Sequence, residues 1–182
     1  MPTMNDANGT PQRVADNGYA LGYGASMSME AHAGDGGNTY TMIVNADPGN
    51  TDIDFAYMKN TSDKTLRIYK IKVFCTADVE ISILAGPTNP TNTTAITPVN
   101  ALIGSGNAAE GDFYYRAGDL DLAGGDQIDT IIIDASVNPT AKAHYTGEIA
   151  LEKNQTVGFN AVSDPNAAIR MTIYFYYHEK VE

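Results

Sequence analysis

The stretch Thr65–Cys75, with the sequence TLRIYKIKVFC, decides the fold class of this chain of 182 residues. Its apolar side chains alternate with polar ones, first at Leu66 and Ile68 and then again from Ile71 onward. An alternation of period two is typical of a strand with one buried face. The phase slips between Ile68 and Ile71, and a slip of one residue turns the following side chains to the opposite face. We therefore predict a β-bulge at Tyr69-Lys70.

Short apolar stretches continue on both sides of this strand, separated by turns rich in Gly, Pro and Asn. No apolar stripe of helical period extends over ten residues, so no helix is expected. Eight or nine short strands with loops of variable length favour a β-sandwich or jelly roll. We therefore predict an all-β fold, a jelly-roll-like antiparallel β-sandwich over residues 39–182 with an extended N-terminal arm. The expected strands are 39–46, 53–58, 65–75, 79–83, 112–115, 127–134, 144–151, 156–161 and 168–178.

Three of these strands carry more specific predictions. In 53–58, alternation places Tyr57 on the same face as Ile53 and Phe55. In 127–134, the run Ile131-Ile132-Ile133 predicts burial on both faces. The last strand, 168–178, is rich in β-branched and aromatic residues, which favours a central place in its sheet or an oligomer contact.

Residues 1–38 differ from the rest of the chain, because they are rich in Gly and nearly lack large aliphatic side chains. They show neither the period of a strand nor that of a helix. We interpret them as an extended or flexible arm that becomes ordered against a partner, and a disordered tail is the alternative.

The net charge is −11, from 22 acidic and 11 basic residues, and it argues against nucleic acid and anionic lipid as partners. No apolar run approaches the length of a membrane span, and no secretion signal is visible at the N-terminus. The basic residues concentrate between Lys64 and Lys72. We expect these to form a solvated face, with contact to an acidic partner as the alternative.

The sequence offers little catalytic chemistry. Its three histidines are scattered, and Cys75, the only cysteine, ends an apolar strand, so we expect a buried, inert thiol. Asp119, Asp121 and Asp126 lie in a Gly-containing turn but do not match the spacing of a calcium-binding loop. We expect these carboxylates to be solvated, and whether the loop binds a cation stays open. We predict no catalytic residues, cofactor or metal.

Four segments together resemble a known group of proteins: LRIYKIKVFCTADVEISIL (66–84), the Thr/Asn/Pro-rich PTNPTNTTAITPVNALIGSGNAAEGDFYY (87–115), GEIALEKNQTVGFNAV (147–162) and MTIYFYYHE (171–179). They are similar to small virion proteins of tailed bacteriophages, of the head-decoration or cement type with a jelly-roll fold. The resemblance covers about residues 53–182. It implies a non-enzymatic structural protein on the outer surface of the capsid, made in the host cytoplasm. The partners it implies are the major capsid protein and further copies of the same chain, in a homodimer or homotrimer.

We expect the contact surface to combine the arm, residues 87–107 of the long connection 86–111, and the last strand, because long connections and exposed tyrosines are frequent at interfaces. For Tyr174 and Tyr176 the alternative is packing between neighbouring strands. The predicted interface residues are Tyr19, Tyr23, Tyr40, Asn89, Thr91, Asn92, Tyr174 and Tyr176.

Three other functions compete with decoration of a head. A glycan- or host-binding module of a phage tail fibre or baseplate predicts a shallow cleft with aromatic and Asp or Asn side chains, although the chain lacks Trp. A hydrolase or lyase predicts converging histidines or carboxylates. The shell subunit of a small jelly-roll virus predicts a basic inner surface, which the acidic composition disfavours.

Overall fold

The computed structural model describes residues 3–5, 11–13, 37–47, 52–88, 90–115, 120–134, 142–145, 148–162 and 168–178. These residues form strands and turns without a helix, which confirms the all-β prediction. Beyond the arm, the strands are β3 (Thr39–Ala46), β4 (Ile53–Asn60), β5 (Thr65–Phe74), β6 (Val79–Ala85), β7 (Thr94–Ala95), β8 (Val99–Asn100), β9 (Gly111–Tyr115), β10 (Asp126–Ile133), β11 (Lys142–Tyr145), β12 (Ile149–Leu151), β13 (Thr156–Ala161) and β14 (Ile169–His178).

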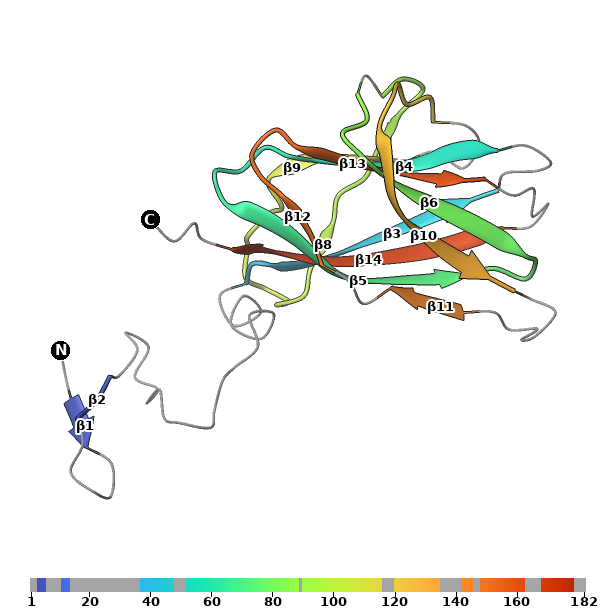
Figure 1. Cartoon of the computed structure of the whole chain (residues 1–182). Helices are drawn as coiled ribbons and strands as arrows, with labels where there is room; N and C mark the ends of the chain where they lie inside the picture. The colour runs from blue at the N-terminus through green and yellow to red at the C-terminus, as the bar shows by residue number, and fades with distance from the viewer. Residues whose placement is uncertain are drawn as a thin grey trace.

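Two six-stranded antiparallel sheets pack against each other around one apolar core (Figure 1). The first, which we call the β4 sheet, has the order β10-β6-β13-β4-β9-β7. The second, the β14 sheet, has the order β11-β5-β14-β3-β8, and β12 also pairs with β5. Strand β14 lies between β5 and β3, so the predicted central position of the last strand is confirmed. Cys75 is buried, as predicted.

The pairing of the strands is that of a jelly roll. Without β7, β8 and β9, and with β11 and β12 counted together, eight strands remain. The first of them pairs with the last (β3 with β14), the second with the seventh (β4 with β13), the third with the sixth and the fourth with the fifth. A chain that pairs in this way is a long hairpin rolled into two sheets, which confirms the predicted fold.

The arm contains two short strands that the sequence did not predict. Strands β1 (Thr3–Asn5) and β2 (Pro11–Arg13) form an antiparallel ladder of their own. Tyr19 and Tyr23 lie outside the described residues, and β3 begins at Thr39.

The predicted bulge in β5 is confirmed. Tyr174 of β14 pairs with Lys70, but the next residue, Phe175, pairs with Ile68, so Tyr69 is the extra residue. Ile68 and Ile71 are both buried, on the two sides of the bulge. Tyr69 and Lys70 are both half-buried and belong to the outward side of the β14 sheet.

A second bulge, in β4, corrects the prediction for Tyr57. Asp54 pairs with Asn160 and Ala56 with Phe159, so Phe55 is the extra residue of this ladder. Beyond the bulge, Ala56 and Met58 belong to the core, whereas Tyr57 does not and instead lines the outer side of the sheet. Alternation across 53–58 failed because the bulge at Phe55 shifts the phase, and the residues after it, Ala56, Tyr57 and Met58, are all apolar or aromatic and do not reveal the shift.

Strand β10 is also not buried on both faces as predicted. Among the described strands it pairs only with β6, at the edge of the β4 sheet. Ile131 and Ile133 point into the core, but Ile132 is 70% exposed. The expected strand 144–151 is interrupted as well, and forms β11 and β12, which both pair with β5.

The connection 86–111 contains two short strands and joins the sheets on one side of the sandwich (Figure 1). Strand β7 extends the β4 sheet beyond β9, and β8 extends the β14 sheet beyond β3. Two buried tyrosines fix the later part of the connection. Tyr40 donates a hydrogen bond to the carbonyl of Ala108 at 3.1 Å, and Tyr177 donates one to Glu110 at 2.8 Å.

Candidate functional site

A hollow lies on the outward face of the β4 sheet, and two tyrosines on neighbouring strands form its floor. Tyr57 of β4 faces Tyr114 of β9, and their rings stack with centroids 6.0 Å apart and planes 23° apart. Tyr57 is only 4% exposed, whereas Tyr114 is half-buried. The next outward pair along the same strands is Lys59 and Asp112, whose charged atoms are 4.0 Å apart.

One wall of the hollow is the beginning of the connection 86–111. Thr88 and Ala123 exchange two backbone hydrogen bonds of 2.9 Å, so two loop segments cover the outside of β13 together. Thr156 of β13 donates its hydroxyl to the carbonyl of Pro87 at 2.8 Å. A Cβ atom at Gly158 would lie 2.6 Å from the Cδ1 of Leu122 and 3.0 Å from the Cγ of Pro87, so a larger residue here would require these loop side chains to shift.

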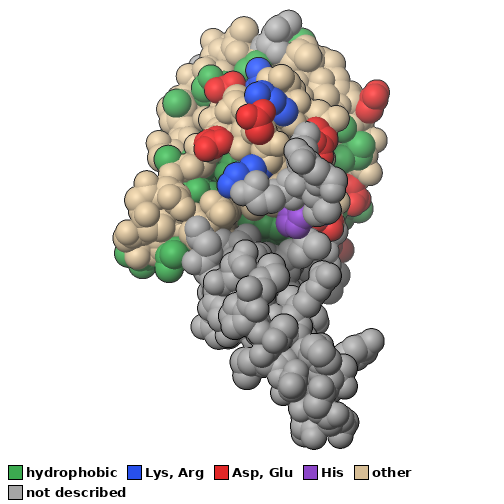
Figure 2. Space-filling model, turned by 90° about the vertical axis from the view of Figure 1, so that its left-hand side faces the viewer, with side chains coloured by type: hydrophobic (Ala, Val, Ile, Leu, Met, Phe, Trp, Pro, Cys, Tyr) green, Lys and Arg blue, Asp and Glu red, His purple; other side chains and the backbone are tan. Residues whose placement is uncertain are grey.

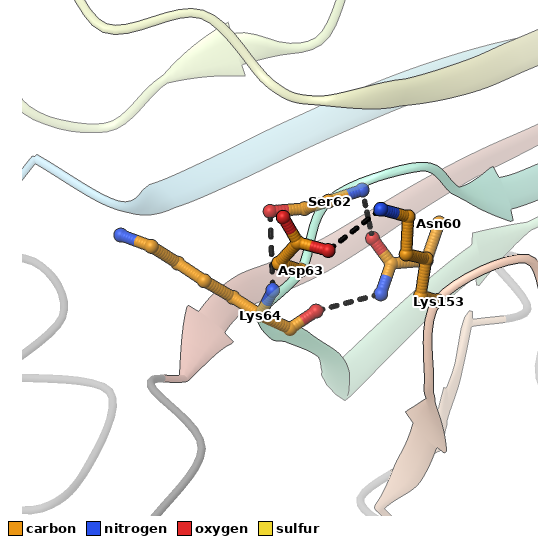
Figure 3. A network of polar contacts seen from close by, with 5 residues as sticks. All are labelled: Asn60, Ser62, Asp63, Lys64 and Lys153. Atoms are coloured by element: carbon orange, nitrogen blue, oxygen red, sulfur yellow. Dashed lines mark hydrogen bonds and ion pairs between the residues drawn. The ribbon is translucent and has the colours of Figure 1, made fainter.

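The part of the rim at Asn154 is fixed by the buried side chain of Asn60, whose contacts with neighbouring residues are drawn in Figure 3. Its amide donates to the carbonyls of Lys64 and Leu151, at 2.8 Å each, and accepts a hydrogen bond from the backbone of Ser62. Its own carbonyl accepts a bond of 2.7 Å from the backbone of Asn154. These bonds fix the turn between β12 and β13, which places Asn154 at the rim with a φ of 67°.

The hollow has a volume of about 400 Å³ and is open to solvent. Its charged groups are one cation and one anion, while the other polar groups are neutral hydroxyls and an amide. Burial, followed by the neighbouring Asp112 and Tyr114, raises the pKa of the Tyr57 hydroxyl, so this group stays neutral. The lining residues are Tyr57, Lys59, Pro87, Thr88, Pro90, Asp112, Tyr114, Asn154 and Thr156.

A second surface lies on the outward side of the β14 sheet, and we call it the tyrosine face: Tyr69, Tyr174 and Tyr176 with Lys70 and Lys72. The ring of Tyr69 lies 6.2 Å from that of Tyr174 and 5.8 Å from that of Tyr176. The ammonium of Lys72 lies 5.1 Å from the centroid of the Tyr174 ring, a cation–π contact. The tyrosines therefore pack against neighbours from adjacent strands.

The connection 86–111 also carries an exposed apolar tip, formed by Val99, Leu102 and Ile103. Ile103 is 95% exposed, and Val99 and Leu102 are exposed too. Two hydrogen bonds hold the tip in place. The side-chain amide of Asn100 donates to the carbonyl of Gly37, and the backbone N–H of Ala101 donates to the carbonyl of Thr39.

The structure places the predicted interface residues in different environments. Tyr40 is 2% exposed and belongs to the core, so the prediction for this residue is wrong. Tyr176 is 3% exposed and offers almost no surface, whereas Tyr174 is half-buried on the tyrosine face. Thr91 and Asn92 are exposed, and their side chains both bond to the carboxylate of Asp121. Asn89, Tyr19 and Tyr23 lie outside the described residues.

The structure does not bring these predicted residues together. The side chain of Tyr174 lies on the outward side of the β14 sheet, whereas Thr91 and Asn92 lie beside the loop that covers the β4 sheet. Sequence reasoning missed the hollow, although Tyr-x-Lys at 57–59 and Asp-x-Tyr at 112–114 are alternations with polar and aromatic residues in one phase. That signal identifies a face of a strand but not the strand that pairs with it.

Charged groups show no concentration typical of a metal centre. Among the described residues, no three His, Cys, Asp or Glu side chains gather closely enough to hold a metal ion. Asp119 lies outside these residues, and Asp126 begins β10. On the end of the sandwich seen in Figure 2, acidic and basic side chains are interspersed over the part that the structure describes.

The described part of the chain has no helix of the length and apolar character needed to cross a membrane. In comparisons with protein-family models, curated proteins and solved structures, none matched this chain. Three surfaces of the described fold are candidate contact sites: the hollow, the tyrosine face and the apolar tip.

Proposed function

We propose that this chain is a non-enzymatic structural protein of a tailed-bacteriophage virion that decorates the outer surface of the head. It would be made in the host cytoplasm, bind the major capsid protein and associate with its own copies as a homodimer or homotrimer. The resemblance of residues 53–182 to decoration proteins suggests this role. The observation that supports it most is the exposed apolar tip, which a jelly roll presents on its longest connection.

An apolar tip of this kind is typical of a contact site. Single exposed apolar residues are common on monomers, but neighbouring ones that stay in water mark interaction surfaces. Val99, Leu102 and Ile103 lie within five residues of each other, and hydrogen bonds to Gly37 and Thr39 hold the segment between them. A contact segment that is ordered before binding loses less conformational entropy in the complex.

Binding to shells that lack this chain tests the proposal. Purified protein should co-sediment with such shells, and particle images should show added density on the outer surface. Ile103→Ser should weaken binding about tenfold, the effect of losing ~1.4 kcal/mol at an interface. Ile132→Ser, on β10, is the matched control, because it removes another exposed isoleucine from a distant strand. Failure of the wild-type chain to bind shells, or equal loss in both variants, would count against the proposal.

The hollow favours a second candidate, a glycan- or host-binding module of a tail fibre or baseplate. Such a module was expected to have a shallow cleft with aromatic, Asp and Asn side chains, and the hollow contains Tyr114, Asp112 and Asn154. Adsorption experiments separate the two functions. Excess purified chain should inhibit phage adsorption to host cells if it belongs to the tail, and should leave adsorption unchanged if it belongs to the head.

A further inference from the structure

We propose that the hollow beside Tyr57 and Tyr114 binds one unit of a neutral saccharide, with the Tyr114 ring as its stacking platform. This inference goes beyond head decoration and deepens the second candidate function, on which its biological meaning rests. The site itself depends only on the geometry of the hollow, so a protein on the head could carry it as well.

The two tyrosines have different roles in the stacking platform. Tyr57 is almost fully buried and its ring stacks on that of Tyr114 at 6.0 Å, so it supports Tyr114 from the neighbouring strand. Tyr114 stays half-buried and lines the hollow. The exposed part of the Tyr114 ring offers apolar surface to the hollow, and the tyrosine hydroxyl adds a polar edge. One side of a pyranose ring presents C–H groups, which pack well on such a face.

The polar groups around the platform match hydroxyl groups, which both donate and accept hydrogen bonds. Lys59 supplies donors, Asp112 supplies acceptors, and the Asn154 amide offers both. At 4.0 Å and with both side chains partly exposed, the Lys59–Asp112 pair leaves hydrogen-bonding capacity for a ligand. Hydrogen bonds between a ligand and the charged side chains of Lys59 and Asp112 would be charge-assisted, and therefore stronger than hydrogen bonds between neutral groups.

The balance of charge in the hollow favours a neutral ligand. A phosphate or a carboxylate would meet Asp112 and the field of a chain with a net charge of −11. A cation would meet Lys59. The volume of about 400 Å³ falls within the range of small-molecule sites, roughly 300–1,000 Å³.

The site is held in shape before any ligand arrives. The bond from Thr156 to Pro87 and the paired bonds between Thr88 and Ala123 fix one wall, and the Asn60 amide fixes part of the rim. A preformed site loses little entropy on binding, which matters for a saccharide because each contact with it is weak.

Nuclear magnetic resonance titration of the full chain tests the inference directly. The probes are glucose, galactose, mannose, rhamnose and N-acetylglucosamine, each as the methyl glycoside and each added up to about 10 mM, tenfold above a Kd of ~1 mM. At least one should shift the amide signals of Tyr114, Asn154 and Thr88 in a saturable way. The signals of the tyrosine face should stay in place. A proline-rich peptide without sugar is titrated in parallel.

Three variants distinguish stacking from nonspecific effects. Tyr114→Ala should weaken saccharide binding at least about tenfold, whereas Tyr114→Phe, which keeps the ring, should stay within about threefold of wild type. Tyr174→Ala removes a half-buried tyrosine from the other sheet and should have no effect. Absence of saturable shifts with all five sugars, shifts that persist in Tyr114→Ala, or binding of the peptide alone would overturn the inference. If Tyr114→Ala binds shells at the wild-type level, head decoration does not depend on saccharide binding, and each proposal can be tested without the other.

Discussion

Asn60 shows how much a single buried amide can organise in this fold. It ends β4, is fully buried, and bonds to three backbone groups through its side chain and to two more through its own backbone. The hydrogen bonds of Asn60 connect two turns that are distant in sequence, 60–65 and 152–155. Its position is therefore structural, although the rim of the hollow depends on it.

Asn60→Leu should lower the free energy of unfolding by about 2–4 kcal/mol, because it leaves buried backbone groups without partners. Chemical denaturation followed by circular dichroism measures this. Lys153→Ala is the control nearby (Figure 3), since its ion pair with Asp63 is largely exposed and should contribute less than about 0.5 kcal/mol. Similar losses in both variants would contradict the role given to the amide.

Tyr177 should make the protein sensitive to alkaline pH. Burial raises the pKa of its hydroxyl above the ordinary value of about 10. The unfolded chain then loses this proton at lower pH than the folded chain does, so stability is full below pH ~10 and falls as the pH rises above it. Chemical denaturation at a series of pH values from about 8 to about 11 should show this decrease in the free energy of unfolding. Tyr177→Phe should make the dependence of the free energy of unfolding on pH less steep. An unchanged slope would assign the effect to the other buried tyrosines.

Among the elements, β10 shows where the pattern of a sequence misleads. Three consecutive isoleucines suggest burial on both faces, yet among the described strands only β6 forms a ladder with this strand. Ile131→Ala should lower the free energy of unfolding by about 2–4 kcal/mol because it opens a cavity in the core. Ile132→Ala should change it by less than about 1 kcal/mol. Comparable losses would mean that Ile132 is covered in solution, for instance by a second copy.

Gly158 allows the loops to lie on the β4 sheet. Gly158→Val should destabilise the fold by about 1–3 kcal/mol, because the new side chain collides with Leu122 and Pro87. It should also displace the wall of the hollow, which chemical-shift changes at Thr88 would report. Ala150→Val, at an exposed position of β12, is the control and should be nearly neutral. A variant as stable as wild type with unchanged shifts at Thr88 would contradict the close approach.

The two bulges explain which parts of the fold could be predicted from the sequence. In β5 the residues around the bulge are unambiguous, since Arg67 and Lys72 mark the solvent side and Ile68 and Ile71 the core. In β4 the three residues that directly follow the bulge, Ala56, Tyr57 and Met58, are all apolar or aromatic, so they do not show which face is buried. Alternation therefore places Tyr57 on the face of Ile53 and Phe55, and the outward position of its ring in the hollow does not follow from the sequence.

At the scale of the whole molecule, the described core begins at β3. Its buried residues run from Tyr40 to Tyr177, drawn from both sheets. A chain that starts at Gly37 should therefore keep the same circular dichroism spectrum and a melting temperature within about 5 °C of the full chain, the shift produced by ~1 kcal/mol in a domain of this size. Loss of cooperative unfolding in the shortened chain would show that the sandwich needs the arm.

The fold class could be predicted because strand period and turn residues are local properties of the sequence. The candidate sites could not be predicted in this way, because the hollow joins Tyr57, Tyr114 and Asn154 from three strands or turns that only the sheet topology brings together. The apolar tip around Ile103 was recognisable only as part of a long connection. Its exposure follows from the bonds that hold that connection on both sheets.

The short strands of the central connection also affect how the protein behaves at high concentration. Free edges of long, flat strands recruit further strands and lead to aggregation. On one side of the described sandwich the outermost strands, β7 and β8, have two residues each, and on the other side β10 and β11 lie in contact. Strand β8 pairs only with Tyr40 and Thr41 of β3, so among the described strands residues 42–46 form the longest edge on this side, and a segment of five residues offers a poor template for adding strands. Crowded copies of this molecule should therefore remain separate folded units, which meet through side chains and not through a continuous sheet.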